Sequence, residues 1–252
     1  MASQEGLLTL KGKLGRISFY KTKDGYLARQ ASALDAKRIQ TDPAFARTRE
    51  NFAEFGRAGK AGKLLRTALR PVLVNIPSGN KVSRLTQAMM KVIQADATSE
   101  RGQRNVIDGE AELLLGFEFN DSAGLTSSLH APFTSAVDRA AGTTVVNVAA
   151  FVPKEMVVSP QGATHFKLVS QAAEVDFEAE TFVVSNQSTA EIPLDNQLLA
   201  PVVMNHAVTP ASTHPIFLLL GIEFFQAVNG KFYSMRNGAY NALSIIDVNG
   251  GV

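Results

Sequence analysis

The stretch IFLLLGIEFFQAV, residues 216–228, is among the most apolar segments of the chain. Its aliphatic and aromatic residues predict a β-strand. The pair Asn229-Gly230 follows it directly and favours a tight turn into another strand. The apolar run is far too short for a membrane-spanning helix, which needs about 20 such residues.

Working outward from this strand, the second half of the chain repeats the same pattern. Short apolar segments alternate with Gly, Pro and Asn, which is typical of an antiparallel β-sandwich of about eight strands. The other predicted strands are residues 111–119, 143–152, 165–171, 180–186, 200–208, 231–235 and 242–248.

Part of the predicted strand at 216–228 has a near copy elsewhere in the chain, since LLLGFEF at 113–119 resembles LLLGIEF at 218–224. Two interpretations are open. The segments are two similar strands of shared composition, or they are equivalent strands of two related halves, in which Gly116 and Gly221 mark matching bulges.

The first half of the chain predicts a different organisation. Residues 7–29 suggest a β-hairpin or extended arm that turns at Asp24-Gly25. Thr41 or Asp42 is positioned to cap a helix that continues until Pro71, and a second helix is expected over 81–97. We therefore predict an α+β protein with three parts: an N-terminal arm or hairpin (1–40), a basic helical region (41–105) and an acidic antiparallel β-sandwich (106–252).

The segment GRAGKAGK (56–63) invites comparison with a phosphate-binding loop. A P-loop requires G-x-x-x-x-G-K followed by Ser or Thr. Arg57 stands where the first Gly is needed and Leu64 where the hydroxyl is needed, so the match fails. We predict a helix, with a buried face and three glycines that let another backbone approach. That face comprises Phe55, Ala58, Ala61, Gly62, Leu65, Ala68 and Leu69, and the glycines are Gly56, Gly59 and Gly62.

Charge separates the two halves more strongly than the net charge of +2 suggests. Residues 1–105 hold 20 Lys and Arg against 8 Asp and Glu, a net +12, whereas residues 106–252 hold 5 against 15, a net −10. The halves are thus expected to face different partners, or each other. The 252 residues contain no cysteine, which excludes disulfides and thiolate metal sites.

Motifs for catalysis, cofactors or metals are not found. The histidines at 130, 165, 206 and 214 lack metal-ligand spacing, and no serine-hydrolase or dinucleotide-binding signature occurs. We expect no enzyme, no cofactor and no metal. Asp176, Glu178 and Glu180 alternate along a predicted strand and would share one face. Three interpretations are open: a solvated face, a docking stripe for cations, or a calcium site, for which the usual Gly-containing loop is lacking.

Four segments of the chain resemble an uncharacterised protein family of Bacteroidota. They are KGKLGRISFYKTKDGYLAR, DPAFARTRENFAEFGRAGKAGKLLR, QADATSERGQRNV and GEAELLLGFEFN. The resemblance covers most of the chain and implies a bacterial source. It transfers no catalytic or binding residue, because the family carries no assigned function.

These patterns favour a self-assembling structural subunit of a filament, tube, sheath or shell. Opposite charges suit head-to-tail contacts between copies, and the N-terminal arm could add as a strand to a neighbouring sheet. The expected interface residues are Leu7, Leu8, Leu10, Ile17, Phe19, Tyr26, Arg49, Lys60, Lys63, Arg70, Asp176, Glu178 and Glu180.

Two other functions stay open. A nucleic-acid-associated or virion-type protein would use the basic half, although no aromatic residues interleave its charges and Phe45, Phe52 and Phe55 are expected to pack. A carbohydrate-binding sandwich is third, weakened by the absence of Trp. No secretory signal is visible, so we expect synthesis in the cytoplasm and leave the final location open.

Overall fold

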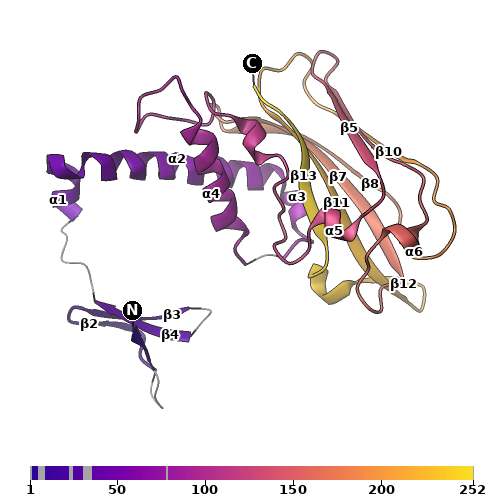
Figure 1. The fold of residues 1–252 in the computed structure, drawn as a ribbon, viewed down its shortest axis with the longest axis horizontal. Helices are drawn as coiled ribbons and strands as arrows, with labels where there is room; N and C mark the ends of the chain where they lie inside the picture. The colour runs from indigo at the N-terminus through magenta and orange to yellow at the C-terminus, as the bar shows by residue number, and fades with distance from the viewer. Residues whose placement is uncertain (1, 5–8, 23–24, 31–35, 78, 252) are drawn as a thin grey trace. The chain divides into compact units, whose positions relative to one another are not determined.

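The computed structural model describes residues 2–4, 9–22, 25–30, 36–77 and 79–251, which contain helices and antiparallel sheets (Figure 1). This confirms the predicted α+β class. The chain divides into two compact units, Met1–Arg49 and Glu50–Val252. The basic helical region and the β-sandwich therefore belong largely to one unit.

The first unit contains a small antiparallel sheet followed by short helices. The sheet confirms the predicted hairpin, which β3 and β4 form, but Leu7, Leu8 and Asp24 lie outside the described residues. Its strands, in spatial order, are β1 (Ala2–Ser3), β4 (Gly25–Gln30), β3 (Ile17–Thr22) and β2 (Gly12–Leu14). A helix that the sequence did not predict, α1 (Ala36–Thr41), and the 3-10 helix η1 (Pro43–Phe45) follow.

The predicted helix start at Asp42 is confirmed. The Asp42 carboxylate accepts a hydrogen bond of 2.9 Å from the Ala44 amide, and Pro43 occupies the first turn, where its missing N–H costs nothing. The long helix α2 (Ala46–Ala68) begins directly afterwards. Arg49 on α2 donates hydrogen bonds of 2.9 Å to the carbonyls of Ile39 and Asp42, which fastens the end of α1.

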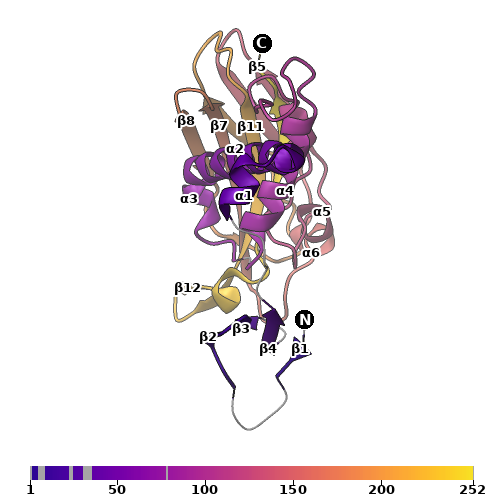
Figure 2. The same ribbon diagram turned by 90° about the vertical axis from the view of Figure 1, so that its left-hand side faces the viewer.

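The second unit has three layers, in which two sheets pack as the predicted sandwich and helices cover its outer face (Figures 1 and 2). The helices are α2, α3 (Arg70–Leu73) and α4 (Lys81–Gln94). The six-stranded sheet has the order β12 (Lys231–Ser234), β11 (Ile216–Val228), β7 (His165–Asp176) and β8 (Thr181–Ser188), with β13 (Ala242–Asn249) on β11 and β9 (Ile192–Pro193) on β7.

A three-stranded sheet forms the third layer, in the order β10 (Val202–Ala207), β6 (Thr143–Val148) and β5 (Phe133–Asp138). Strands β5 and β9 were not predicted. The remaining short elements are η2 (Ala111–Leu114), α5 (Leu125–Ser128), α6 (Pro153–Met156) and η3 (Met235–Gly238).

Strand β11 separates two hydrophobic cores. Phe217 and Leu219 pack against the helices, whereas Leu218 and Leu220 pack against the three-stranded sheet. Successive side chains of a strand point to opposite faces, so a strand between two covered faces must be apolar at every position. This explains the unbroken apolar run at 216–222. Full burial of each such side chain contributes about 1.5–3 kcal/mol.

The predicted strand at 111–119 is wrong. Residues 111–114 form η2. Beyond them, an isolated bridge at Glu118 and three backbone hydrogen bonds join residues 116–119 to β13, without forming a strand. Gly116 has φ of +75°, which interrupts extended structure. The register shift in β11 lies between Leu218 and Leu219 and not at Gly221. The hypothesis of equivalent strands with matching bulges is therefore wrong as well.

The predicted apolar face of α2 is confirmed except at Phe55, which is 58% exposed, and the neighbouring Phe52 is 62% exposed. Gly62 packs against the side chains of Leu85 and Met89, and not against another backbone. A Cβ at Gly56 or Gly59 would meet no atom of the described residues within 4 Å. The prediction that another backbone approaches the helix is thus wrong for Gly62. At the other two glycines, no described residue lies close enough to make such a contact.

The predicted stop at Pro71 is shifted as well. Helix α2 already ends at Ala68, and Pro71 lies in the first turn of α3. A proline is tolerated there because the first N–H groups of a helix have no intrahelical partner.

Candidate functional site

The turn between β7 and β8 carries the three carboxylates that the sequence placed on one strand face. That prediction is wrong, because β7 ends at Asp176 and β8 begins at Thr181, so Glu178 and Glu180 lie in the turn. The Asp176 carboxylate accepts hydrogen bonds of 2.9 Å from the amides of Glu178 and Ala179 and so closes the turn. The turn brings these carboxylates near one another, and the alternation of side chains along a strand does not.

Each of these carboxylates has a different environment. The backbone hydrogen bond from Ala179 lowers the pKa of Asp176, which also lies 3.6 Å from the His214 imidazole. The hydrogen bond and charge of Lys60, 2.6 Å away, lower the pKa of Glu180. Both side chains of the Lys60–Glu180 pair are exposed, so the pair contributes little stability. The carboxylate of Glu178 makes no hydrogen bond or ion pair with the described residues.

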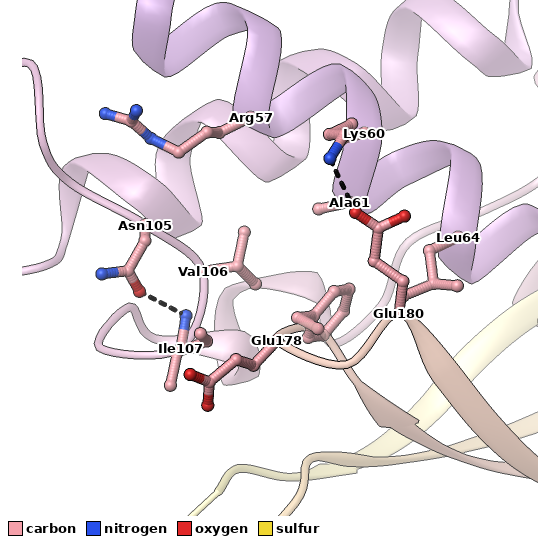
Figure 3. A pocket seen from close by; sticks show the side chains of 10 residues that line it. Arg57, Lys60, Ala61, Leu64, Asn105, Val106, Ile107, Glu178 and Glu180 are labelled. Atoms are coloured by element: carbon pink, nitrogen blue, oxygen red, sulfur yellow. Dashed lines mark hydrogen bonds and ion pairs between the residues drawn. The ribbon is translucent and has the colours of Figure 1, made fainter.

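A cleft of about 260 Å³ lies between this turn, α2 and the loop at 105–107 (Figure 3). Its apolar surface comes from Ala61, Leu64, Val106, Ile107 and Phe177, and its polar rim from Arg57, Lys60, Asn105, Glu178 and Glu180. A second hollow of about 260 Å³ shares Ile107, Phe177 and Glu178 with the first and adds Asp108, Asp176 and His214 to the lining.

The loop that forms one wall of the cleft is fastened to α2. Arg57 donates to the carbonyls of Arg104, at 2.6 Å, and Gly102. The buried carboxylate of Glu54 accepts a 2.7 Å hydrogen bond from the Gly102 amide. Sequence reasoning missed Glu54, although an acid four residues before Ala58 on an otherwise apolar helix face was a visible signal of a buried polar contact.

The basic residues predicted for the interface do not act as one group. Arg49 holds the end of α1, and Lys60 binds Glu180 of the same chain. Lys63 contributes only a longer-range attraction that helps to lower the pKa of Glu180. Arg70 is exposed at the start of α3. The structure thus brings one predicted cation to one predicted carboxylate, within the chain.

The N-terminal sheet places Ile17, Phe19 and Tyr26 on one face. Cross-strand pairing sets Leu14 opposite Ile17, Phe19 opposite Ala28, and Lys21 opposite Tyr26. Directly paired residues share a face in an antiparallel sheet. Leu14 is 69% and Ile17 44% exposed. None of the described residues between 2 and 49 is buried. Leu10, also predicted for the interface, precedes β2 and is 51% exposed.

The opposite face of this sheet combines cations with an aromatic ring. Lys13, Ser18 and Arg29 are paired across it, and the Arg29 guanidinium lies 5.5 Å from the centre of the Tyr20 ring. On the apolar face, the Lys21 ammonium lies 5.4 Å from the centre of Tyr26. The expectation that no aromatic residues interleave the basic charges is therefore wrong for the N-terminal sheet.

The histidines do not form a recognisable catalytic group. His206 is buried, which lowers its pKa, and its Nε2 lies 2.9 Å from the Ser170 hydroxyl. That hydroxyl donates to the Leu219 carbonyl at 2.7 Å, so its proton is already committed. The ring of His165 packs edge-on against Phe232, and His130 is exposed. Among the described residues, no three His, Asp or Glu side chains group as a metal site.

Comparison of the chain with protein-family models, curated proteins and solved structures gave no match. The resemblance to a family of Bacteroidota consequently stays a prediction. No helix within the described part of the chain has the length and apolar character needed to cross a membrane.

Proposed function

We propose that the protein is a self-assembling structural subunit of a filament, tube, sheath or shell. The observation that carries this proposal is the N-terminal sheet, which has an apolar face and no buried residue among its described positions. Two-layer packing is the usual way for a sheet to become stable, because one apolar face must be removed from water. In an assembly, another subunit supplies the second layer.

The energetic argument concerns the apolar face defined by Leu14, Ile17, Phe19 and Tyr26. Fully burying such side chains contributes about 1.5–3 kcal/mol each. Association costs about 4–15 kcal/mol, so this face alone gives a weak contact. A weak contact becomes effective when it repeats along a polymer and when charges support it.

The charge distribution supports contacts between unlike surfaces. Residues 1–49 hold 10 Lys and Arg against 4 Asp and Glu, a net +6, and residues 50–252 hold 15 against 19, a net −4. A surface that meets a different surface on the next copy generates rings or helical polymers. Opposite net charges favour this head-to-tail arrangement over the pairing of like units.

A nucleic-acid-associated protein is the second candidate, and the face with Lys13, Tyr20 and Arg29 is the observation that favours it. Basic side chains bind phosphates, and aromatic rings stack on unpaired bases. The Arg29 guanidinium already covers the Tyr20 ring, however, so stacking requires that side chain to move.

Light scattering after size exclusion, at low and high salt and with or without nuclease, tests both functions. We expect the wild-type protein to form large particles that survive nuclease and appear ordered by negative-stain imaging. The double substitution Ile17→Ser and Phe19→Ser should abolish them. The matched control, Val203→Ser with Val228→Ser, removes exposed strand residues of the other unit and should leave assembly unchanged.

Two outcomes would reject this function. A wild-type monomer under all conditions excludes self-assembly by the chain alone. Particles that disappear with nuclease, and are lost on replacing Lys13 and Arg29 by Ser, favour the nucleic-acid function instead.

A further inference from the structure

We propose that the cleft beside the β7–β8 turn receives the apolar face of the N-terminal sheet from a second copy of the chain. The inference rests on the proposed function and identifies the acceptor surface for its subunit contact. Each copy would then carry one donor surface and one acceptor surface, which is the requirement for head-to-tail growth.

The two surfaces match in their apolar character. The cleft and its adjoining hollow, about 260 Å³ each, share Ile107 and Phe177 as apolar lining. Ile107 is 55% exposed, so it presents apolar surface at the mouth of the cleft. The donor face presents Ile17 and Phe19, which are of suitable size to cover it.

The surfaces also match in charge. The adjoining hollow is lined by the carboxylates of Asp108, Asp176 and Glu178, with His214 as its sole basic side chain among the described residues. Lys21 lies within the apolar donor face, opposite Tyr26. A cation surrounded by apolar residues fits an apolar cleft with a carboxylate rim, and Glu178 has no cation of its own among the described residues.

The cations that line the cleft do not compete strongly with Lys21 of the second copy for the carboxylate of Glu178. Arg57 is bound to the carbonyls of Gly102 and Arg104, and Lys60 is bound to Glu180. The acidic hollow beyond Ile107 is therefore left for a cation from outside. The N-terminal unit, with its net charge of +6, offers such a cation on its apolar face, and residues 50–105 carry an equal net charge.

Pairing of the donor face with its own symmetry copy is disfavoured. The described residues of that face include Lys21 and no acid. A two-fold contact would bring two like charges into an apolar interface, which is unfavourable. Pairing with the acidic hollow beside the cleft neutralises the charge of Lys21.

Two variants test the match because each damages one surface only. The donor variant carries Ile17→Ser and Lys21→Glu, and the acceptor variant carries Ile107→Ser and Glu178→Lys. Each alone should raise the critical concentration for assembly more than about tenfold, since a reversed charge costs over 1.4 kcal/mol. Mixed in equal amounts, they should form a discrete heterodimer by light scattering, because each retains the surface that the other lacks.

A matched control for the acceptor variant is Leu198→Ser with Glu155→Lys, an exposed apolar residue and an exposed acid that line neither the cleft nor the adjoining hollow. It should assemble like the wild type. Circular dichroism and thermal unfolding should show that all variants are folded. In one chain, Lys21→Glu combined with Glu178→Lys should recover at least part of the lost assembly.

Three results would overturn the inference. If the acceptor variant assembles like the wild type, the acceptor surface lies elsewhere and the proposed function stands. If both variants fail alone and their mixture stays monomeric, the two surfaces are not complementary. If the wild type is itself monomeric, the proposed function fails and this inference fails with it.

Discussion

Gln171 shows how single polar residues tie the layers of the second unit together. It is fully buried on β7 and donates a 2.8 Å hydrogen bond to the carbonyl of Ala68, where α2 ends. Asn75, which follows α3, donates at 3.0 Å to the buried carboxylate of Glu223 on β11. Buried polar groups are costly unless paired, so these contacts select one placement of the helices on the sheet.

The partly buried Glu118 and the buried Glu174 respond to pH in opposite directions. Burial raises the pKa of Glu118 above its ordinary 4.5, despite a 3.0 Å hydrogen bond from the Leu125 amide. Burial would also raise the pKa of Glu174, but hydrogen bonds from Ser212 and Thr209 outweigh it and lower the pKa. The fold therefore favours protonated Glu118 and ionised Glu174.

We expect Glu118→Gln to stabilise the protein at pH 7. The folded protein loses stability as the pH rises above the pKa that Glu118 has in the unfolded chain, because the folded state disfavours the ionised carboxylate. Glutamine mimics the protonated form of this side chain. The gain should shrink towards pH 4, where the acid is protonated. Thermal unfolding across this range measures it. A destabilised Glu118→Gln variant at pH 7 would contradict the expectation.

Glu174→Gln is the matched contrast. The stabilisation from ionised Glu174 is complete above its unfolded pKa and is lost as the pH falls through its lower folded pKa. The variant should therefore be less stable than wild type at pH 7, with a deficit that narrows in acid.

Helix α2 contains residues that its own stability does not require. Two glycines lie at middle positions of this helix, where glycine costs about 0.5–1 kcal/mol of stability relative to alanine. A Cβ at Gly56 or Gly59 would meet no described atom within 4 Å, and the adjacent Phe52 and Phe55 are exposed. No contact among the described residues explains why these two glycines and two phenylalanines occupy the helix.

Replacing Gly56 and Gly59 by Ala should consequently stabilise the protein by about 0.5–1 kcal/mol each, measured by urea unfolding. Gly221→Ala is the contrasting variant. Its Cβ would lie 2.6 Å from the Ala242 carbonyl and 3.0 Å from Val169, so we expect a loss of about 1–3 kcal/mol. If the alanines on α2 were destabilising, an unseen contact would have to occupy that face.

At the scale of the whole molecule, both cores are built by the second unit. Their buried residues run from Ala58 to Ile245, and none is a described residue of the first unit. The N-terminal sheet therefore adds little to the folding of the rest of the chain. Its apolar face is available for the contact between copies that we propose above.

Deletion of residues 1–35 tests this division. The shortened chain should unfold within about 0.5 kcal/mol of the full-length protein, because no core residue is removed. It should also lose the ability to form large particles. Denaturant unfolding and light scattering measure the two effects separately. A large loss of stability would show that the sheet supports the second unit directly.

Several features of this protein were determined by the sequence alone because their signals are local. The apolar run at 216–228, the cap at Asp42 and the period of α2 predicted their elements correctly, since each depends on residues within a few positions. The α+β class follows from the order of such elements along the chain.

The composition of the surfaces depends on contacts between distant parts of the chain. Glu178 and Glu180 lie outside the strands because a turn closes between β7 and β8, and 111–119 has no full strand partner. Ile17, Phe19 and Tyr26 share a face because pairing across a hairpin sets their register. Pairing and burial depend on residues far apart in the chain, which local periodicity cannot specify.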